Sequence, residues 1–171
     1  MIDPGPGWRT DRLTIEPLTR GHAAELFAVL DDPQLHEFTG GSPLPLAALT
    51  DRYTRLESRR STDGTEHWCN WMLRERDTGS AVGTLEATLP ANGPDRGPAY
   101  VAWVVGRQAQ GRGYASEAAL SLVDRLRSAG WTVVAHIHPR HVASQRVASR
   151  AGLRPTEHVV DGEVRWERPR S

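Results

Sequence analysis

The segment from Ala99 to Ile137 restricts the fold most, because its pattern predicts a strand–helix–strand unit. An apolar strand over Ala99–Gly106 leads into a turn with two glycines, after which a helix begins at once and ends at Gly130; Trp131–Ile137 then predicts a second strand. One side of the helix is apolar and consists of Ala115, Ala118, Ala119, Leu122, Val123 and Leu126. Two strands joined in this way pair in parallel, with a right-handed crossover. The chain therefore contains a parallel strand pair covered by a helix.

The rest of the chain alternates between helical and strand periodicity. Helices are expected over residues 19–30, 45–60 and 144–151, and strands over residues 12–17, 68–75, 81–89, 153–160 and 163–167. The order β-α-α-β-β-β-α-β-α-β-β predicts an α/β fold (α+β, with a mixed sheet) and helices on its faces. With 171 residues and no long linker, residues 1–171 are expected to form one domain. Residues 1–9, rich in Pro and Gly, are expected to be flexible.

The composition excludes several classes of site. All 21 basic residues are arginine, so neither a P-loop lysine nor a Schiff-base lysine is present. The formal net charge of zero gives no support for nucleic acid or membrane as a partner. Cys69 is the single cysteine, so no internal disulfide forms, and no apolar run approaches the roughly 20 residues of a membrane span. A cytoplasmic location is the simplest expectation.

The turn between the Ala99–Gly106 strand and the helix is the main candidate site. The amides at the start of a helix have no partners within the helix, and glycines allow a ligand to approach the backbone. Gly111 and Gly113 at this junction therefore predict a phosphate or pyrophosphate site, to which Arg107 and Arg112 can add positive charge. The alternative is a tight turn without a ligand. A dinucleotide fold is disfavoured because Ser116 stands where its third glycine is needed.

The same turn also carries a family resemblance. Gln108-x-x-Gly111-x-Gly113 resembles the pyrophosphate-binding signature of the GNAT N-acetyltransferases. Gly113-Tyr114-Ala115-Ser116-Glu117-Ala118 is similar to the branch of ribosomal-protein alanine acetyltransferases. Ser144-Gln145-Arg146-Val147 with Ala151-Gly152-Leu153 is similar to the same branch. The resemblance extends over most of the chain.

The resemblance implies a mostly antiparallel central sheet in which one parallel strand pair, Ala99–Gly106 and Trp131–Ile137, splays apart. It implies that acetyl-CoA is the co-substrate and that pantetheine contacts the backbone near Val104 and Val105. The residues implied to hold the pyrophosphate through their amides are Gln110, Gly111, Arg112, Gly113, Tyr114 and Ala115. A backbone amide of the first splayed strand is implied to polarise the thioester carbonyl.

The sequence does not decide between several amine acceptors, and it does not give the oligomeric state. Direct transfer is expected, because no nucleophile stands out and Cys69 lies on an expected buried strand. The branch resemblance favours a protein N-terminal amine as the acceptor, and a small-molecule amine is the alternative. A non-catalytic acyl-CoA-binding regulatory or interaction domain is a further alternative. A homodimer is compatible with the sequence.

Three residues are candidates for catalysis or for contacts to the co-substrate. Glu86 lies in a strand beside the implied acceptor cleft and is the candidate general base; the alternative is a surface carboxylate. Ser144 is the candidate proton donor to the leaving thiolate, because Ala148 occupies the position of the tyrosine that many relatives have. Its alternative role is a helix N-cap. His141 replaces the asparagine that is frequent in the family, and either hydrogen-bonds to pantetheine or faces solvent.

Other polar residues are weaker candidates. Glu157, His158 and Glu163 are secondary choices for the general base. His136, His138 and His141 are close in sequence but lack a fourth ligand nearby, so no metal site is expected. Four tryptophans on the expected strands are expected to pack in the core: Trp68, Trp71, Trp103 and Trp131.

Overall fold

The computed structural model describes residues 7–169, whose strands form one mixed sheet of eight strands in the order β1-β2-β3-β4-β5-β6-β8-β7. The strands are β1 (Trp8–Arg9), β2 (Leu13–Pro17), β3 (Glu66–Glu75), β4 (Ala81–Pro90), β5 (Ala99–Val105), β6 (Val133–Ile137), β7 (Arg154–Val160) and β8 (Glu163–Arg168). The helices are α1 (Ala23–Leu30), α2 (Leu46–Leu56), α3 (Tyr114–Ser128) and α4 (Val142–Arg150). Strands β5 and β6 pair in parallel, and every other neighbouring pair of strands is antiparallel.

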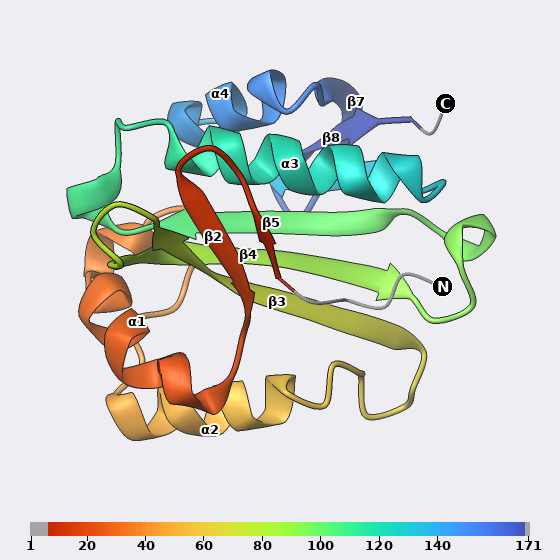
Figure 1. Cartoon of the computed structure of the whole chain (residues 1–171). Coiled ribbons are helices and arrows are strands. Elements are labelled where there is room, and N and C mark those ends of the chain that lie inside the picture. The colour runs from red at the N-terminus through yellow and green to blue at the C-terminus, as the bar shows by residue number, and fades with distance from the viewer. Residues whose placement is uncertain (1–6, 170–171) are drawn as a thin grey trace.

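Two layers of helices cover the sheet: α3 and α4 lie on one face and α1 and α2 on the other (Figure 1). Because successive strand residues point to opposite faces, Leu85 of β4 packs in the larger core that includes α3, whereas Met72 of β3 packs in a second core with Leu26 and Tyr53. Each face of the central strands is therefore occupied by side chains from a different pair of helices.

The parallel pair is short, and this shapes the centre of the molecule. β5 and β6 pair only at Ala99 with Val133 and at Tyr100 with Val134. Beyond Tyr100, β5 continues for five residues paired with β4 alone. The two strands separate from that point, which confirms the splayed parallel pair in a mostly antiparallel sheet.

The N-terminal residues correct one expectation. The segment 1–9 is expected to be flexible; residues 1–6 lie outside the described residues, but Trp8 and Arg9 form β1. The indole nitrogen of Trp8 donates to Oγ of Ser121 on α3 at 3.1 Å, and the ring contacts Trp71 edge to face. These contacts, which no local pattern reveals, order the strand.

Other differences concern where elements begin and end. α2 ends at Leu56 rather than Arg60, and α4 begins at Val142 rather than Ser144. β6 begins at Val133, because Thr132 precedes the pairing with β8 that defines the strand. These shifts are small, since the apolar pattern defines the middle of an element better than its termini.

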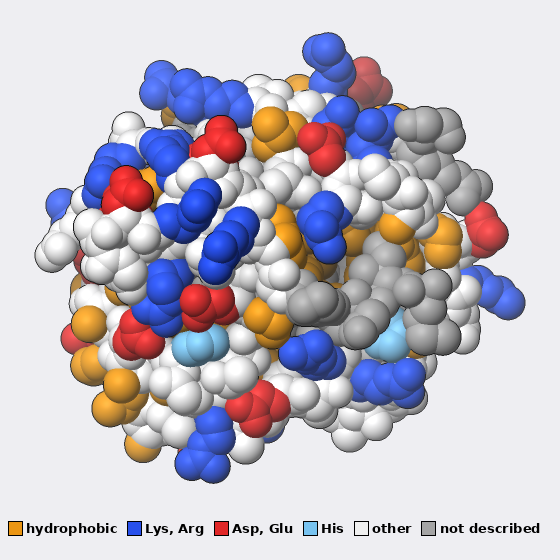
Figure 2. All heavy atoms as spheres, viewed as in Figure 1, with side chains coloured by type: hydrophobic (Ala, Val, Ile, Leu, Met, Phe, Trp, Pro, Cys, Tyr) orange, Lys and Arg blue, Asp and Glu red, His pale blue; other side chains and the backbone are white. Residues whose placement is uncertain are grey.

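The face in Figure 2 shows acidic and basic side chains intermingled over both helical layers. This distribution agrees with the formal net charge of zero. None of the helices in residues 7–169 has both the length and the apolarity needed to cross a membrane.

Candidate active site

The turn before α3 has the geometry of an anion site. Gly111 and Gly113 have φ values of +75° and +85°, a left-handed conformation that residues with a Cβ rarely adopt. Gly113 is the N-cap of α3, and no side chain of the described residues caps the helix. The amides of Tyr114 and Ala115 in the first turn therefore remain available to a ligand, with the positive end of the helix dipole behind them.

The side chains around this turn brace it. The Tyr114 hydroxyl donates to the Glu75 carboxylate, and Nη2 of Arg112 donates to the same oxygen at 2.8 Å. The hydrogen bond from Tyr114 lowers the pKa of Glu75 below its ordinary value, as do Thr78 and Arg112. Tyr114 is buried, so its contribution to a ligand site is its amide and not its ring.

The two arginines that flank the turn have carboxylate partners. Nε of Arg107 lies 3.6 Å from Asp32, and Arg112 forms the ion pair with Glu75. Both guanidinium groups are about half exposed, at 53% and 52% of the side chain. Their charge is thus partly neutralised before any phosphate arrives, and the backbone amides become the main feature of the site.

Gln110 and Glu117 are structural in this arrangement. Nε2 of Gln110 donates to the carbonyl oxygen of Val105 at 3.0 Å, which ties the loop to the end of β5. Glu117 accepts from Oγ1 of Thr10 at 2.6 Å and from Nε of Arg12 at 2.7 Å. The first turn of α3 is therefore anchored to the chain segment between β1 and β2.

The backbone of β5 has one free side beyond the parallel pairing. The amide of Ala99 donates toward the β6 side, to Thr132, and the amide of Gly106 donates toward β4, to Val82. Alternation along the strand turns Val104 toward β4 and turns Trp103 and Val105 toward the gap. This geometry favours Trp103 and Val105 over Val104 as backbone partners of a ligand between β5 and β6. The sequence pattern alone does not show which residues of β5 turn their backbone groups toward the gap.

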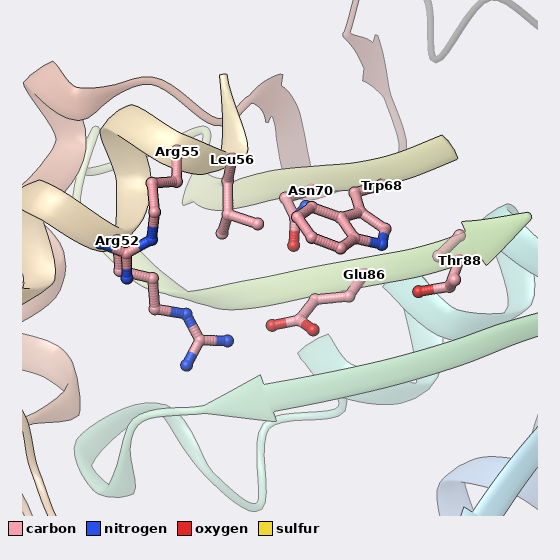
Figure 3. A pocket seen from close by; sticks show the side chains of 8 residues that line it. Arg52, Arg55, Leu56, Trp68, Asn70, Glu86 and Thr88 are labelled. Carbon is pink, nitrogen blue, oxygen red and sulfur yellow. The ribbon is translucent and has the colours of Figure 1, made fainter. Parts of the chain in front are cut away.

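Glu86 lies in a pocket on the α1–α2 side of the sheet. The pocket has a volume of about 350 Å³ and is lined by Arg52, Arg55, Leu56, Trp68, Asn70, Glu86, Ala87 and Thr88. In Figure 3 the Glu86 carboxyl group lies between the arginines of α2 and the Trp68 ring. Glu86 is opposite Ala102 of β5, two residues beyond the last β5–β6 pair, so the pocket lies beside the gap.

The surroundings of Glu86 favour its neutral form. Burial raises the pKa of Glu86 above the ordinary glutamate value, and the positive charge of Arg52 opposes this effect. A carboxylate with a raised pKa near a cleft has the property expected of a general base. The alternative of an exposed surface acid disagrees with its position in the pocket wall.

Trp68 and Asn70 of β3 were not expected at this site. Because β3 pairs with β4 at Asn70 opposite Glu86, Asn70 faces the same side of the sheet as the carboxyl group. Trp68, expected in the core, is only partly buried and forms a wall of the pocket. The sequence signal that could have placed them here is the alternation of β3, in which Trp68, Asn70 and Met72 share one face of the sheet.

Ser144 is not the N-cap of α4. It is the third residue of the helix, and His141 occupies the N-cap position. The helix begins earlier because the chain turns directly after β6, where the amide of His141 donates to the carbonyl oxygen of His138. Oγ of Ser144 instead accepts a hydrogen bond from Nε1 of Trp103 at 3.2 Å, which joins α4 to β5.

His141 contacts the opposite layer of the fold. Its ring stacks on Phe38, with centroids 4.5 Å apart and planes at 17°, and His138 lies 5.4 Å from the same ring. Burial lowers the pKa of His141 below its ordinary value, while Glu37 opposes the shift. His141 is therefore neither free in solvent nor directed by a hydrogen bond of its side chain to another described residue.

The remaining histidine of this group faces the α1–α2 side. Tyr100 contacts the ring of His136, and Nε2 of His136 is buried without a hydrogen-bond partner among the described residues. Nowhere in residues 7–169 do three or more His, Cys, Asp or Glu side chains gather in a way that can hold a metal ion.

Comparison with models of known protein families identifies the family of this chain. A model of the acetyltransferase (GNAT) domain matches residues 12–154, well over half of the chain. The chain belongs to this family. As a GNAT protein it is an N-acetyltransferase by class, and the matched segment contains the glycine turn, Glu86, His141 and Ser144.

Solved structures agree with the GNAT assignment. A putative GNAT-family acetyltransferase from Bordetella pertussis is 25% identical, with a TM-score of 0.70, over 95% of this chain and 98% of that one. RimL, a ribosomal L7/L12 alpha-N-protein acetyltransferase solved with coenzyme A, is 17% identical with a TM-score of 0.73, over 94% and 95%. AAC(6')-Ib, solved with paromomycin and acetyl-CoA, is 17% identical with a TM-score of 0.72, over 94% of each chain. No curated protein sequence matches this GNAT chain.

Proposed function

We propose that the chain, acting as a single domain, transfers the acetyl group of acetyl-CoA directly to a primary amine. The observation that supports this most strongly is a juxtaposition. The Glu86 pocket lies beside the gap between β5 and β6, and β5 leads from this gap into the turn before the uncapped start of α3. This path has the parts needed to hold a phosphate-bearing carrier, a thioester and an amine.

The open backbone of the turn supports acetyl-CoA as the co-substrate. Gly111 has no atom within 4 Å of the place where a Cβ would stand, so the backbone there is open to a pyrophosphate. The amides of residues 110–115 are proposed to hold that group. The free backbone groups of Trp103 and the amide of Val105 are proposed to pair with pantetheine, as a strand would, whereas the Val105 carbonyl oxygen accepts from Gln110.

The chain's own groups then supply the acid and base chemistry. When bound, acetyl-CoA supplies an activated acetyl group. An amine attacks only in its neutral form, and Glu86, with its raised pKa, takes the proton from it directly or through water. A β5 amide that faces the gap donates to the carbonyl oxygen. Ser144 donates its proton to the leaving sulfur and takes one from water in exchange, since Ala148 has no polar group for this task.

The acceptor class is proposed from the resemblance to the branch of ribosomal-protein alanine acetyltransferases. RimL acts on a ribosomal protein, which supports a protein N-terminal amine, and AAC(6')-Ib with bound paromomycin supports a small-molecule amine as the alternative. A non-catalytic acyl-CoA-binding domain is the second candidate, favoured by the absence of a tyrosine at Ala148.

A CoA-release assay tests the proposal. The protein is incubated with acetyl-CoA and a panel of primary amines, and free thiol is measured with a chromogenic reagent. The protein's own thiol does not interfere, because Cys69 is buried. Amine-dependent release with acetylated product supports catalysis. Tight acetyl-CoA binding without amine-dependent release supports the non-catalytic candidate.

A further inference from the structure

The pocket at Glu86 contains more positive than negative charge. Its charged lining residues are Arg52, Arg55 and Glu86, and the other five are neutral. A bare alkylammonium ion entering this pocket meets two guanidinium groups and only one carboxyl group. Like charges at such short range disfavour binding.

The two arginines of the pocket are exposed, and the charge of Arg52 acts on Glu86. Neither Arg52 nor Arg55 forms an ion pair with a carboxylate among residues 7–169, although other arginines such as Arg12, Arg74 and Arg112 do. They are three residues apart on α2, so both side chains project from one face of the helix. Figure 3 shows that both come from the helix at one end of the pocket.

Uncharged groups complete the lining. The side-chain amide of Asn70 and the hydroxyl of Thr88 form no hydrogen bond with another described residue, and both belong to the pocket. The Trp68 ring forms a flat apolar wall, held by a hydrogen bond from its Nε1 to Glu66 at 3.1 Å. These groups suit a small polar ligand whose carbon chain lies against the indole.

We propose that the acceptor is a primary amine that also carries an oxyanion, with Arg52 and Arg55 binding the anion and Glu86 receiving the amine. The arginine fork matches the oxygens of a carboxylate or a phosphate, which share this chemistry. The inference rests on the proposed acetyl transfer and specifies its substrate class. The negative group of the acceptor neutralises the pocket, which makes the approach of the ammonium group favourable.

Matched acceptors test the inference. The carboxylate arm compares 4-aminobutyrate with 4-aminobutyramide, and the phosphate arm uses an aminoalkyl phosphate of the same length. Spermidine supplies a polycation, and peptides with Asp or Asn as second residue separate a protein N-terminus from a small molecule. We expect kcat/KM for an anionic acceptor to exceed that of its neutral match by about tenfold or more.

Variants connect the preference to the two arginines. Arg52→Gln and Arg55→Gln should each lower kcat/KM for the anionic acceptor about tenfold, and the double variant should abolish the preference. The Kd of acetyl-CoA should stay unchanged in all three. Arg60→Gln removes an exposed charge that does not line the pocket and is the matched control. Equal activity on acids and amides in the wild type, or a loss of acetyl-CoA affinity in Arg52→Gln, overturns the inference.

A binding measurement separates this inference from the proposed function. The protein is saturated with CoA and titrated with 4-aminobutyrate by calorimetry. If no amine is acetylated but the acid binds and Arg52→Gln weakens binding, the proposed function fails and the anion site stands. If neutral amines are acetylated as well as acids, the function stands and the anion site fails. If the acid neither reacts nor binds and no other amine is acetylated, both fail.

Discussion

Nε1 of Trp103 donates a hydrogen bond to Oγ of Ser144 at 3.2 Å, beyond the point where β5 and β6 stop pairing. The bond uses a lone pair of the hydroxyl and leaves its proton free for another acceptor. Because Trp103 also directs its backbone toward the gap, the pair joins the strand that would contact pantetheine to the helix that would supply the proton. Ser144 is thus oriented by the core rather than by the end of α4.

Replacing Ser144 with alanine should slow turnover without weakening co-substrate binding. We expect Ser144→Ala to lower kcat by about 10²-fold, because a leaving thiolate needs its proton mainly in the transition state. The Kd of acetyl-CoA, measured by calorimetry, should hardly change. Trp103→Phe is the matched control: it removes the same hydrogen bond but keeps the hydroxyl, and should slow turnover less. If both variants lose only about 1 kcal/mol of stability, Ser144 is structural.

The general base is tested by Glu86→Gln, which keeps the shape of the side chain and removes its charge. We expect kcat/KM to fall by about 10²-fold or more while acetyl-CoA still binds. Asn70→Ala is a useful comparison, because Asn70 faces the same pocket but has no titratable group. A fall of less than about threefold in Glu86→Gln would show that a water chain, and not this carboxylate, takes the proton.

The rate should depend on pH in a direction set by Glu86. Burial raises the pKa of Glu86, so the base form is lost as pH falls through a value above that of free glutamate. The acid limb of kcat/KM should therefore lie above the ordinary glutamate range and vanish in Glu86→Gln. Removing the charge of Arg52, which opposes the shift, should move the limb to higher pH. The same amine is used with every variant, so its own titration is common to all of them.

The glycine turn can be tested with a control of equal backbone strain. Gly111→Val should weaken acetyl-CoA binding by about tenfold or more, because a branched side chain would fill the open space at the turn and φ is +75°. Gly64 has φ +73° with open space around it, so Gly64→Val imposes similar strain in the loop before β3. Equal acetyl-CoA affinity in the two folded variants would contradict a phosphate site at the turn.

His141 should titrate below the ordinary histidine range. Burial against Phe38 lowers the pKa of His141, and Phe38→Ala should raise it by exposing the ring. A histidine whose pKa is depressed by folding stabilises the protein above the ordinary pKa, and this stabilisation is lost as pH falls. NMR titration of the ring protons of both proteins measures the shift. An unchanged pKa in Phe38→Ala would show that the stack does not bury the ring.

The sequence by itself determined the elements and the family. Alternating residues such as Leu13 and Ile15 predicted β2, and the helical spacing of Ala118, Leu122 and Leu126 predicted α3, because these periods follow from local backbone geometry. Gly111 and Gly113 predicted the turn, since a left-handed φ is a local requirement. The family resemblance rested on the same local patterns, and the family model confirms it.

Only the tertiary structure decided how distant residues meet. The pairing of Asn70 with Glu86, the hydrogen bond from Trp103 to Ser144, and the stack of His141 on Phe38 each join segments whose relative positions no local pattern encodes. The strand register determined which amides of β5 face the gap, and α2 brought Arg52 and Arg55 to the Glu86 pocket. Long-range packing sets these contacts, because a side chain's partner depends on how whole elements dock and not on its neighbours in sequence.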